Sequence, residues 1–171
     1  LPAEQAVMLV EGVSDLAEHA RRVEMRPCIA AMVAFETPLE VDFDGAFVQG
    51  SGLTWVARDS SKPGRPPGDQ WVLHSGPEWA EAHWDDGRGA QCAALTEEFA
   101  RLVGDLPPMA HGDAHRWRYS IAPEPLDAEF LADDGAGLVL CGDWCRGGRV
   151  EGAFLSGVAA AGHLLRRAAR R

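Results

Sequence analysis

The sequence predicts an α+β fold built on a mostly antiparallel sheet of about five or six strands, with helices on one side. Four strand candidates follow one another between residues 28 and 74, and the loops between them are too short for crossover helices. Helical patterns flank this run, and a further strand and helix close the chain. The 171 residues are 46% hydrophobic and 25% charged, which is typical of a globular domain with a real core.

The first half of the chain supplies most of the sheet. Residues 2–23 read as helical, with Ser14 as a suitable N-cap. Strands are expected at 28–35, 46–49, 53–58 and 70–74. In the third of these, Leu53, Trp55 and Ala57 alternate with polar or smaller residues and are expected to share a face. The segment DSSKPGRPPGD is rich in Pro and Gly and is expected to be a loop.

The second half begins with two helical pieces. The first starts near Pro77, and the second ends at Gly104 and has a predicted buried stripe of Cys92, Leu95, Phe99 and Leu102. Residues 115–121 form a strand in which His115, Trp117 and Tyr119 alternate with Arg116, Arg118 and Ser120. An acidic loop at 122–136, a strand at 138–142 and a helix from Val150 complete the chain.

Composition excludes several classes of function. The net charge of −10 disfavours a nucleic-acid partner, because phosphate binding needs a basic face. The longest weakly polar run, residues 152–165, is too short and small-sided for a membrane span. None of the four cysteines forms a C-x-x-C pair or has a His at zinc-ligand spacing, so no metal site is expected. Free thiols indicate a cytoplasmic protein, and the non-Met first residue suggests a start in the middle of a longer protein.

A glycine-rich turn at residues 141–157, CGDWCRGGRVEGAFLSG, is the strongest candidate for a ligand site. It joins an apolar strand to a helix whose unpaired N-terminal N–H groups attract an anion or a polarised carbonyl. Asp143 can accept hydrogen bonds from hydroxyl groups. The helix carries a stripe of small residues. If a missing part of the protein normally covers this stripe, Ala153, Gly157 and Ala160 are expected at a surface or against a partner copy. From the residues alone, tight helix–strand packing is an equally good explanation of these small side chains.

The segment GDWCRGGRVEGAFLSGVAAA, residues 142–161, resembles the C-terminal flavin segment of the flavin-containing amine oxidase superfamily. Two further stretches, LTWVARDSSKPGR and AHRWRYS, are similar to its bacterial renalase-like branch of NAD(P)/FAD-dependent oxidoreductases. The resemblance implies that residues 1–136 are a substrate domain and that 137–171 are the last strand, turn and helix of an FAD-binding domain. It also implies that the N-terminal Rossmann unit, which this chain lacks, is the partner that completes the FAD site.

The same resemblance implies roles for individual residues. The expected FAD-binding residues are Gly142, Asp143, Arg149, Val150, Glu151, Gly152 and Ala153. The expected substrate-binding residues are Trp55, Ser61, Lys62, His115 and Trp117, with Arg116 and Arg118 as the alternative if the strand faces the other way. No residue is a convincing acid, base or nucleophile, which agrees with direct hydride transfer to a flavin.

The resulting hypothesis is an FAD-dependent oxidoreductase that accepts hydride from a small molecule, either a dihydronicotinamide such as a nicotinamide dinucleotide or an amine. The chain by itself is expected to be inactive. The alternative is a non-catalytic interaction domain that keeps the fold and binds no flavin.

Overall fold

The computed structural model describes residues 1–170, which divide into two compact units. Pro27–Arg118 form one, here called the sheet unit, and Leu1–Arg26 combine with the segment from Tyr119 onward to form the other, here called the terminal unit. The assignment of 1–136 to a substrate domain and 137–171 to an FAD-binding domain stays a prediction.

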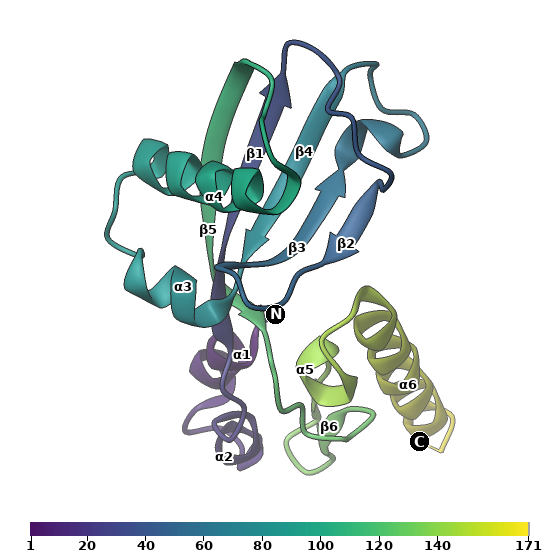
Figure 1. Ribbon diagram of the computed structural model, residues 1–171. Helices are drawn as coiled ribbons and strands as arrows, with labels where there is room; N and C mark the ends of the chain where they lie inside the picture. The colour runs from purple at the N-terminus through teal and green to yellow at the C-terminus, as the bar shows by residue number, and fades with distance from the viewer. Residues whose placement is uncertain (171) are drawn as a thin grey trace. The chain divides into compact units, whose positions relative to one another are not determined.

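The sheet unit is built on five strands in the order β2-β3-β4-β1-β5 (Figure 1). Their bounds are β1 Arg26–Phe35, β2 Gly45–Phe47, β3 Leu53–Arg58, β4 Asp69–Ser75 and β5 Met109–Ile121. The pairs β1–β4, β3–β4 and β2–β3 are all antiparallel. The predicted α+β class with a mostly antiparallel sheet is therefore confirmed.

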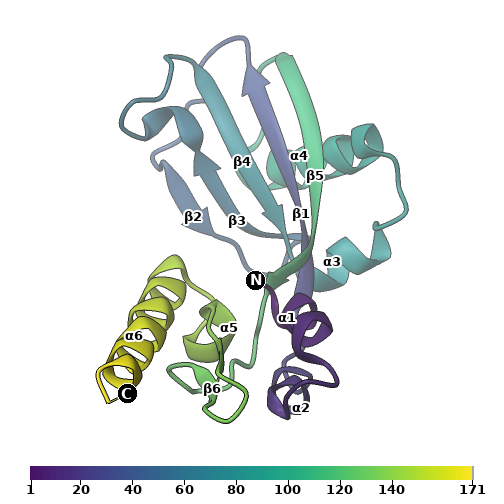
Figure 2. The same cartoon turned by 180° about the vertical axis from the view of Figure 1, so that it is seen from behind.

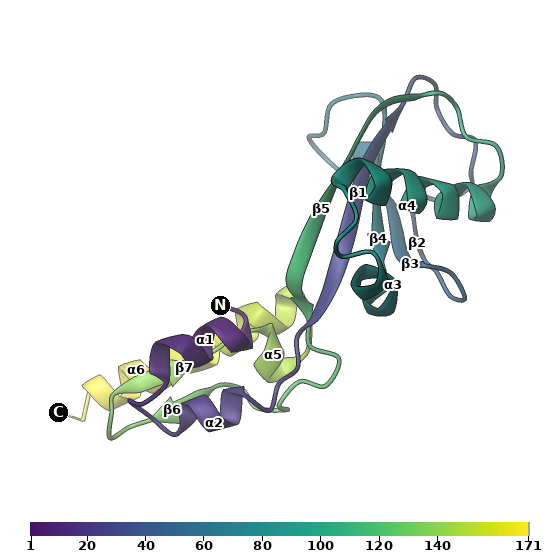
Figure 3. The same ribbon diagram turned by 90° about the vertical axis from the view of Figure 1, so that its left-hand side faces the viewer.

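Helices of the sheet unit cover one face of the sheet. These are α3 (Pro77–Ala82) and α4 (Arg88–Val103), which lie on the same side of the strands in the side view (Figure 3). α4 buries Leu95 and Phe99 against Trp71 and Leu73 of β4. Burial of each such side chain contributes about 1.5–3 kcal/mol, so this face is the main core. Leu102, predicted to share the buried stripe, is instead 44% exposed.

A β-bulge corrects the predicted faces of β3. The register of β3 against β4 shifts between Leu53 and Trp55, so these two residues do not share a face. Leu53 is fully buried in the core below α4, together with Val56. Trp55 and Ala57 lie on the opposite face, because side chains alternate along the strand after the bulge.

Glu98 of α4 fixes the turn that leads into β3. Its carboxylate accepts hydrogen bonds from the Ser51 hydroxyl at 2.7 Å and from the Gly52 N–H at 3.2 Å. The Ser51 hydroxyl lowers the pKa of Glu98, and the Gly52 N–H and the Arg101 guanidinium add to this effect against partial burial. Gly52 has no room for a side chain, because a Cβ there would lie 2.4 Å from the Trp79 ring.

The terminal unit contains the remaining elements. They are α1 Ala3–Val10, α2 Leu16–Ala20, β6 Leu131–Asp133, β7 Leu138–Leu140, α5 Asp143–Arg146 and α6 Val150–Ala168. β6 and β7 pair with each other as a two-stranded sheet, so β7 stands apart from the five-stranded sheet as expected. Trp144 is fully buried in the core of this unit, among Ala3, Ala6, Val23 and Met25.

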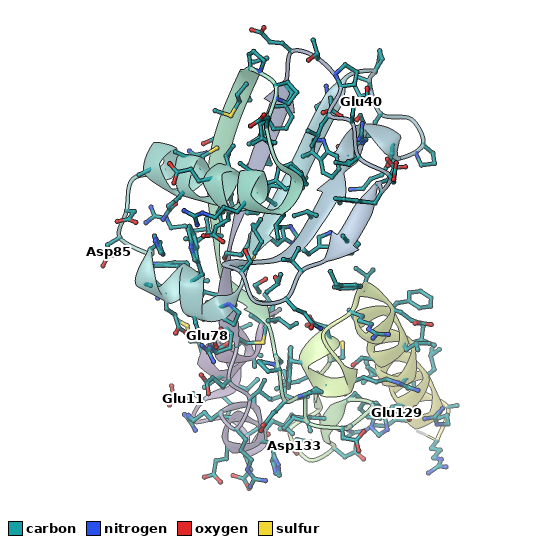
Figure 4. All side chains as sticks on the ribbon, viewed as in Figure 1. Glu11, Glu40, Glu78, Asp85, Glu129 and Asp133 are labelled. Atoms are coloured by element: carbon teal, nitrogen blue, oxygen red, sulfur yellow. The ribbon has the colours of Figure 1, made fainter. Side chains whose placement is uncertain are left out.

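The predicted helix at residues 2–23 is two helices. Gly12 adopts a φ of 73°, a conformation that favours glycine, and the chain turns there. The Ser14 hydroxyl accepts a hydrogen bond from the Leu16 N–H and donates one to the Asp133 carboxylate at 2.5 Å. Asp133, at the end of β6, is labelled in Figure 4. Ser14 thus joins the start of α2 to the end of β6. The short elements β6 and α5 were not predicted, because three or four residues are too few to show a period.

Within residues 1–170, no helix is long and apolar enough to cross a membrane.

Candidate functional site

The turn between β7 and α6 depends on glycine at two positions. A Cβ at Gly152, in the first turn of α6, would lie 2.3 Å from the Gly147 carbonyl oxygen. Gly147 adopts a φ of 113°, a region that side chains disfavour. The α5–α6 turn therefore packs backbone against backbone, which agrees with the tight-packing explanation of the small residues.

Ser156 ties the turn to the loop before β6. Its hydroxyl is fully buried, donates to the Glu129 carbonyl at 2.6 Å and accepts from the Gly142 N–H at 3.1 Å. Cys145 of α5 is also fully buried, and burial raises the pKa of its thiol to about 11. These contacts fix the position of α5 relative to the start of α6.

A cavity of about 350 Å³ opens at the N-terminus of α6. Its lining consists of Arg146, Gly147, Gly148, Arg149, Glu151, Gly152 and Leu155. α6 has no side-chain cap, so the N–H groups of its first turn stay available and give this end a partial positive charge. Arg149 adds a full charge, whereas Arg146 pairs with Glu129 at 2.9 Å.

The residues at this cavity fit a flavin in chemical terms. Free N–H groups, an arginine and a glycine backbone suit an electron-rich heterocycle edge or a phosphate. Of the seven expected FAD-binding residues, Arg149, Glu151 and Gly152 line the cavity. Gly142 and Asp143 lie in the turn before it, and Asp143 accepts a hydrogen bond from the Trp144 N–H at 3.0 Å. Val150 is 90% exposed and Ala153 is half-buried, and neither lines the cavity.

The expected surface stripe of α6 is only partly at a surface. Ala160 is 5% exposed, and Ala153 and Gly157 are half-buried. The exposed apolar side chains of α6 are its large ones, including Phe154 at 68% and Leu165 at 72%. The small residues were misplaced because Gly152, Ser156 and Ala160 form the side of the helix that packs inward.

A second candidate site is the face of the five-stranded sheet that carries no α-helix of residues 27–118 (Figure 2). We call it the open face. Directly paired residues of antiparallel strands share a face, so Phe47, Trp55 and His74 lie together there. The Phe47 and Trp55 rings are 4.7 Å apart. The face also includes Met32, Val72, His115 and Trp117.

The two candidate sets of β5 lie on opposite faces of the sheet. Ala114 is fully buried in the core below α4, so His115 and Trp117 lie on the open face by alternation. Their rings are 4.6 Å apart, and Trp117 is 54% exposed. Arg116 and Arg118 lie on the α4 side, where both guanidinium groups approach the Trp84 ring. Arg116 and Arg118 therefore lie on the opposite face from His115 and Trp117, and the choice of His115 and Trp117 as substrate-binding residues stays a prediction.

The loop after β3 brings Ser61 and Lys62 toward the sheet. The Ser61 hydroxyl donates to the Arg58 carbonyl at 2.9 Å, so it is used within the loop. Lys62 and Arg65 both pair with Asp59, at 2.8 Å and 3.2 Å. The Lys62 ammonium lowers the pKa of Asp59, chiefly through its hydrogen bond. Asp59 therefore partly neutralises the positive charges of this loop.

His74 was missed by sequence reasoning. The apolar residues of β4, Trp71 and Leu73, form the core face, and His74 follows them with no sequence signal of its own. Partial burial lowers the pKa of His74, and the nearby Lys62 ammonium lowers it further. A neutral imidazole therefore lies beside Trp55 on the open face.

Comparison with known proteins identifies the class. A model of the family described as flavin containing amine oxidoreductase matches residues 2–165. The chain therefore belongs to the flavin-containing amine oxidoreductases, and the resemblance to that superfamily is confirmed. A family defined by its flavin also confirms the expected cofactor, FAD.

One solved structure that this chain resembles is a candidate protoporphyrinogen oxidase from Exiguobacterium sp. 255-15. The TM-score is 0.73 at 11% sequence identity, over 97% of this chain and 40% of that one. At this identity the likeness shows a shared fold, and it confirms the predicted fold class. This chain spans less than half the length of that protein.

Proposed function

We propose that this chain is the substrate-binding part of a renalase-like FAD-dependent oxidoreductase that takes hydride from a dihydronicotinamide. The donor would lose a hydride from its ring and become the aromatic pyridinium. The flavin supplies the hydride acceptor when bound. The residues of the open face hold and orient the planar donor, with Trp55 and Trp117 offering aromatic surfaces for stacking.

The charge of the open face supports a dihydronicotinamide over an amine. The five strands contain two acidic residues, Asp69 and Asp113. Asp69 is buried, and its carboxylate accepts hydrogen bonds from the Leu39 N–H and the Trp71 indole N–H. Asp113 forms an ion pair with Arg88. No strand carboxylate of residues 27–118 is therefore left to receive an ammonium group, and the Lys62 ammonium near the face would repel one.

Hydride acceptance is tested with the longest natural protein that contains this chain, loaded with FAD. We expect NADH to bleach the visible flavin absorption under anaerobic conditions, and 2-phenylethylamine, as the amine probe, to leave it unchanged. Reduction by the amine and not by NADH would refute the choice of donor. A full-length protein that binds no flavin would favour the alternative, a non-catalytic interaction domain.

We further propose that a Rossmann unit N-terminal to this chain completes the FAD site and packs on the outer side of α6. The exposed Phe154, Val158 and Leu165 support this, because large apolar patches mark interaction surfaces. The chain alone is then inactive. Expressed without the preceding sequence, it should bind no FAD, and FAD binding by the chain alone would refute the proposal.

We expect the protein to act in the cytoplasm. The four cysteines, Cys28, Cys92, Cys141 and Cys145, are all free thiols, as is usual in a reducing compartment. Fractionation of cells that express a tagged full-length protein tests this expectation.

A further inference from the structure

His74 occupies a specific place on the open face. Its strand β4 lies between β3 and β1, and its direct partners are Trp55 on one side and Ala30 on the other. Directly opposite residues have Cβ atoms about 4.5–5.5 Å apart. The Trp55 indole lies against Gly45 and Phe47 of β2, and His74 is the next residue on the same face toward β1. Ala30 has only a methyl side chain, and it is 4% exposed.

The ring nitrogens of His74 have no protein partner. Among residues 1–170, no hydrogen bond or ion pair reaches either of them, although the side chain is half-buried. Neither nitrogen is among the fully buried polar atoms that lack a partner, so both are accessible to water and to a ligand. The charged group that acts on His74 is the Lys62 ammonium, which is itself paired with Asp59. Neither supplies a hydrogen bond to the imidazole.

We propose that His74 hydrogen-bonds the carboxamide of the nicotinamide ring and so determines how that ring lies on the open face. This rests on the proposed function. A neutral imidazole carries one N–H donor and one acceptor nitrogen, and a carboxamide offers both complementary groups. Trp55 supplies the stacking surface, and His74 supplies the polar contact that distinguishes one edge of the substrate ring from the other.

The test uses the full-length, FAD-loaded protein and four variants. His74→Phe keeps a flat ring and removes both hydrogen-bonding groups, whereas His74→Gln keeps a donor and an acceptor. His74→Ala removes the side chain and stands in if His74→Phe lowers the melting temperature. His19→Phe makes the same change at an exposed position on α2, outside the sheet unit. The readouts are the dissociation constant of NAD⁺ from calorimetry, and the dissociation constant and limiting rate of flavin reduction by NADH from stopped flow.

We expect His74→Phe to weaken binding of NAD⁺ and NADH by roughly fivefold to tenfold, the scale of one lost hydrogen bond. His74→Gln should recover most of this loss, and His19→Phe should behave as wild type. The inference is overturned if His74→Phe and His74→Ala bind NAD⁺ as tightly as His19→Phe while NADH still reduces the wild-type flavin. A wild-type protein that NADH does not reduce would instead overturn the proposed function, and this inference with it.

Discussion

Gly152→Ala and Gly157→Ala are the same substitution in the same helix, and we expect opposite effects on stability. The added methyl group at residue 152 would lie 2.3 Å from the Gly147 carbonyl oxygen. At residue 157 it would meet no heavy atom within 4 Å. Both glycines lie inside α6, where alanine is favoured over glycine by about 1 kcal/mol. The difference between the variants therefore isolates the cost of the contact.

The size of that cost follows from the geometry. Carbon and oxygen atoms in contact are about 3.3–3.6 Å apart, so the methyl group at residue 152 is about 1 Å too close. The atom it meets belongs to the backbone of the α5–α6 turn and cannot rotate away. Overpacking of this kind costs about 1–3 kcal/mol or more. We expect Gly157→Ala to raise the free energy of unfolding by up to about 1 kcal/mol. The free energy of unfolding of Gly152→Ala should be about 1–3 kcal/mol lower than that of Gly157→Ala.

Urea unfolding of the full-length protein measures both values, with FAD content of the purified variants as a second readout. Gly152→Ala should also lose FAD, because relief of the contact displaces the turn that lines the α6 cavity. Equal stabilisation by the two substitutions would refute the backbone-contact argument.

Three other expectations can be checked directly. Ser156→Ala should lower the free energy of unfolding by about 1–3 kcal/mol, since the Gly142 N–H and the Glu129 carbonyl each lose a hydrogen bond; an unchanged urea midpoint would contradict this. Because the pKa of Glu98 is lowered in the folded state, its stabilising contribution is present at neutral pH and is lost as the pH falls below about 4.5. Glu98→Gln should flatten that part of the stability curve, and an equally steep curve would argue against the assignment. Ellman's reagent should label the exposed Cys141 first and the buried Cys145 only on unfolding, and fast labelling that persists in Cys141→Ser would count against this order.

The strands of the sheet could be predicted from the sequence because their side chains alternate between two faces. Residues 53–58 were predicted with the bounds that β3 has, and 28–35 and 70–74 fall within β1 and β4. The same reasoning put Leu53 and Trp55 on one face, which is wrong because a bulge between them adds one residue that alternation does not reveal. β5 begins six residues earlier than expected, at Met109, since its first half contains no apolar alternation.

The residues of the candidate site were harder to predict from the sequence. The turn before α6 was located from its glycines, but packing and ligand binding require the same small residues, and the resemblance to a family was needed to choose a flavin. His74 was not predicted as a site residue, because its candidate role depends on its neighbours in the adjacent strands. Its partners Trp55 and Ala30 are 19 and 44 positions away in the sequence, and pairing at that distance has no local signal.

The ion pairs of the loop after β3 have a consequence for any phosphate that binds there. Lys62 and Arg65 already form ion pairs with Asp59, so a phosphate that binds them would replace the Asp59 carboxylate as their anionic partner. The carboxylate would return to water as the phosphate arrived, and few salt ions would be released. Binding at this loop should therefore depend on salt much less steeply than two free cations would suggest, and a dinucleotide would draw its affinity mainly from the aromatic face.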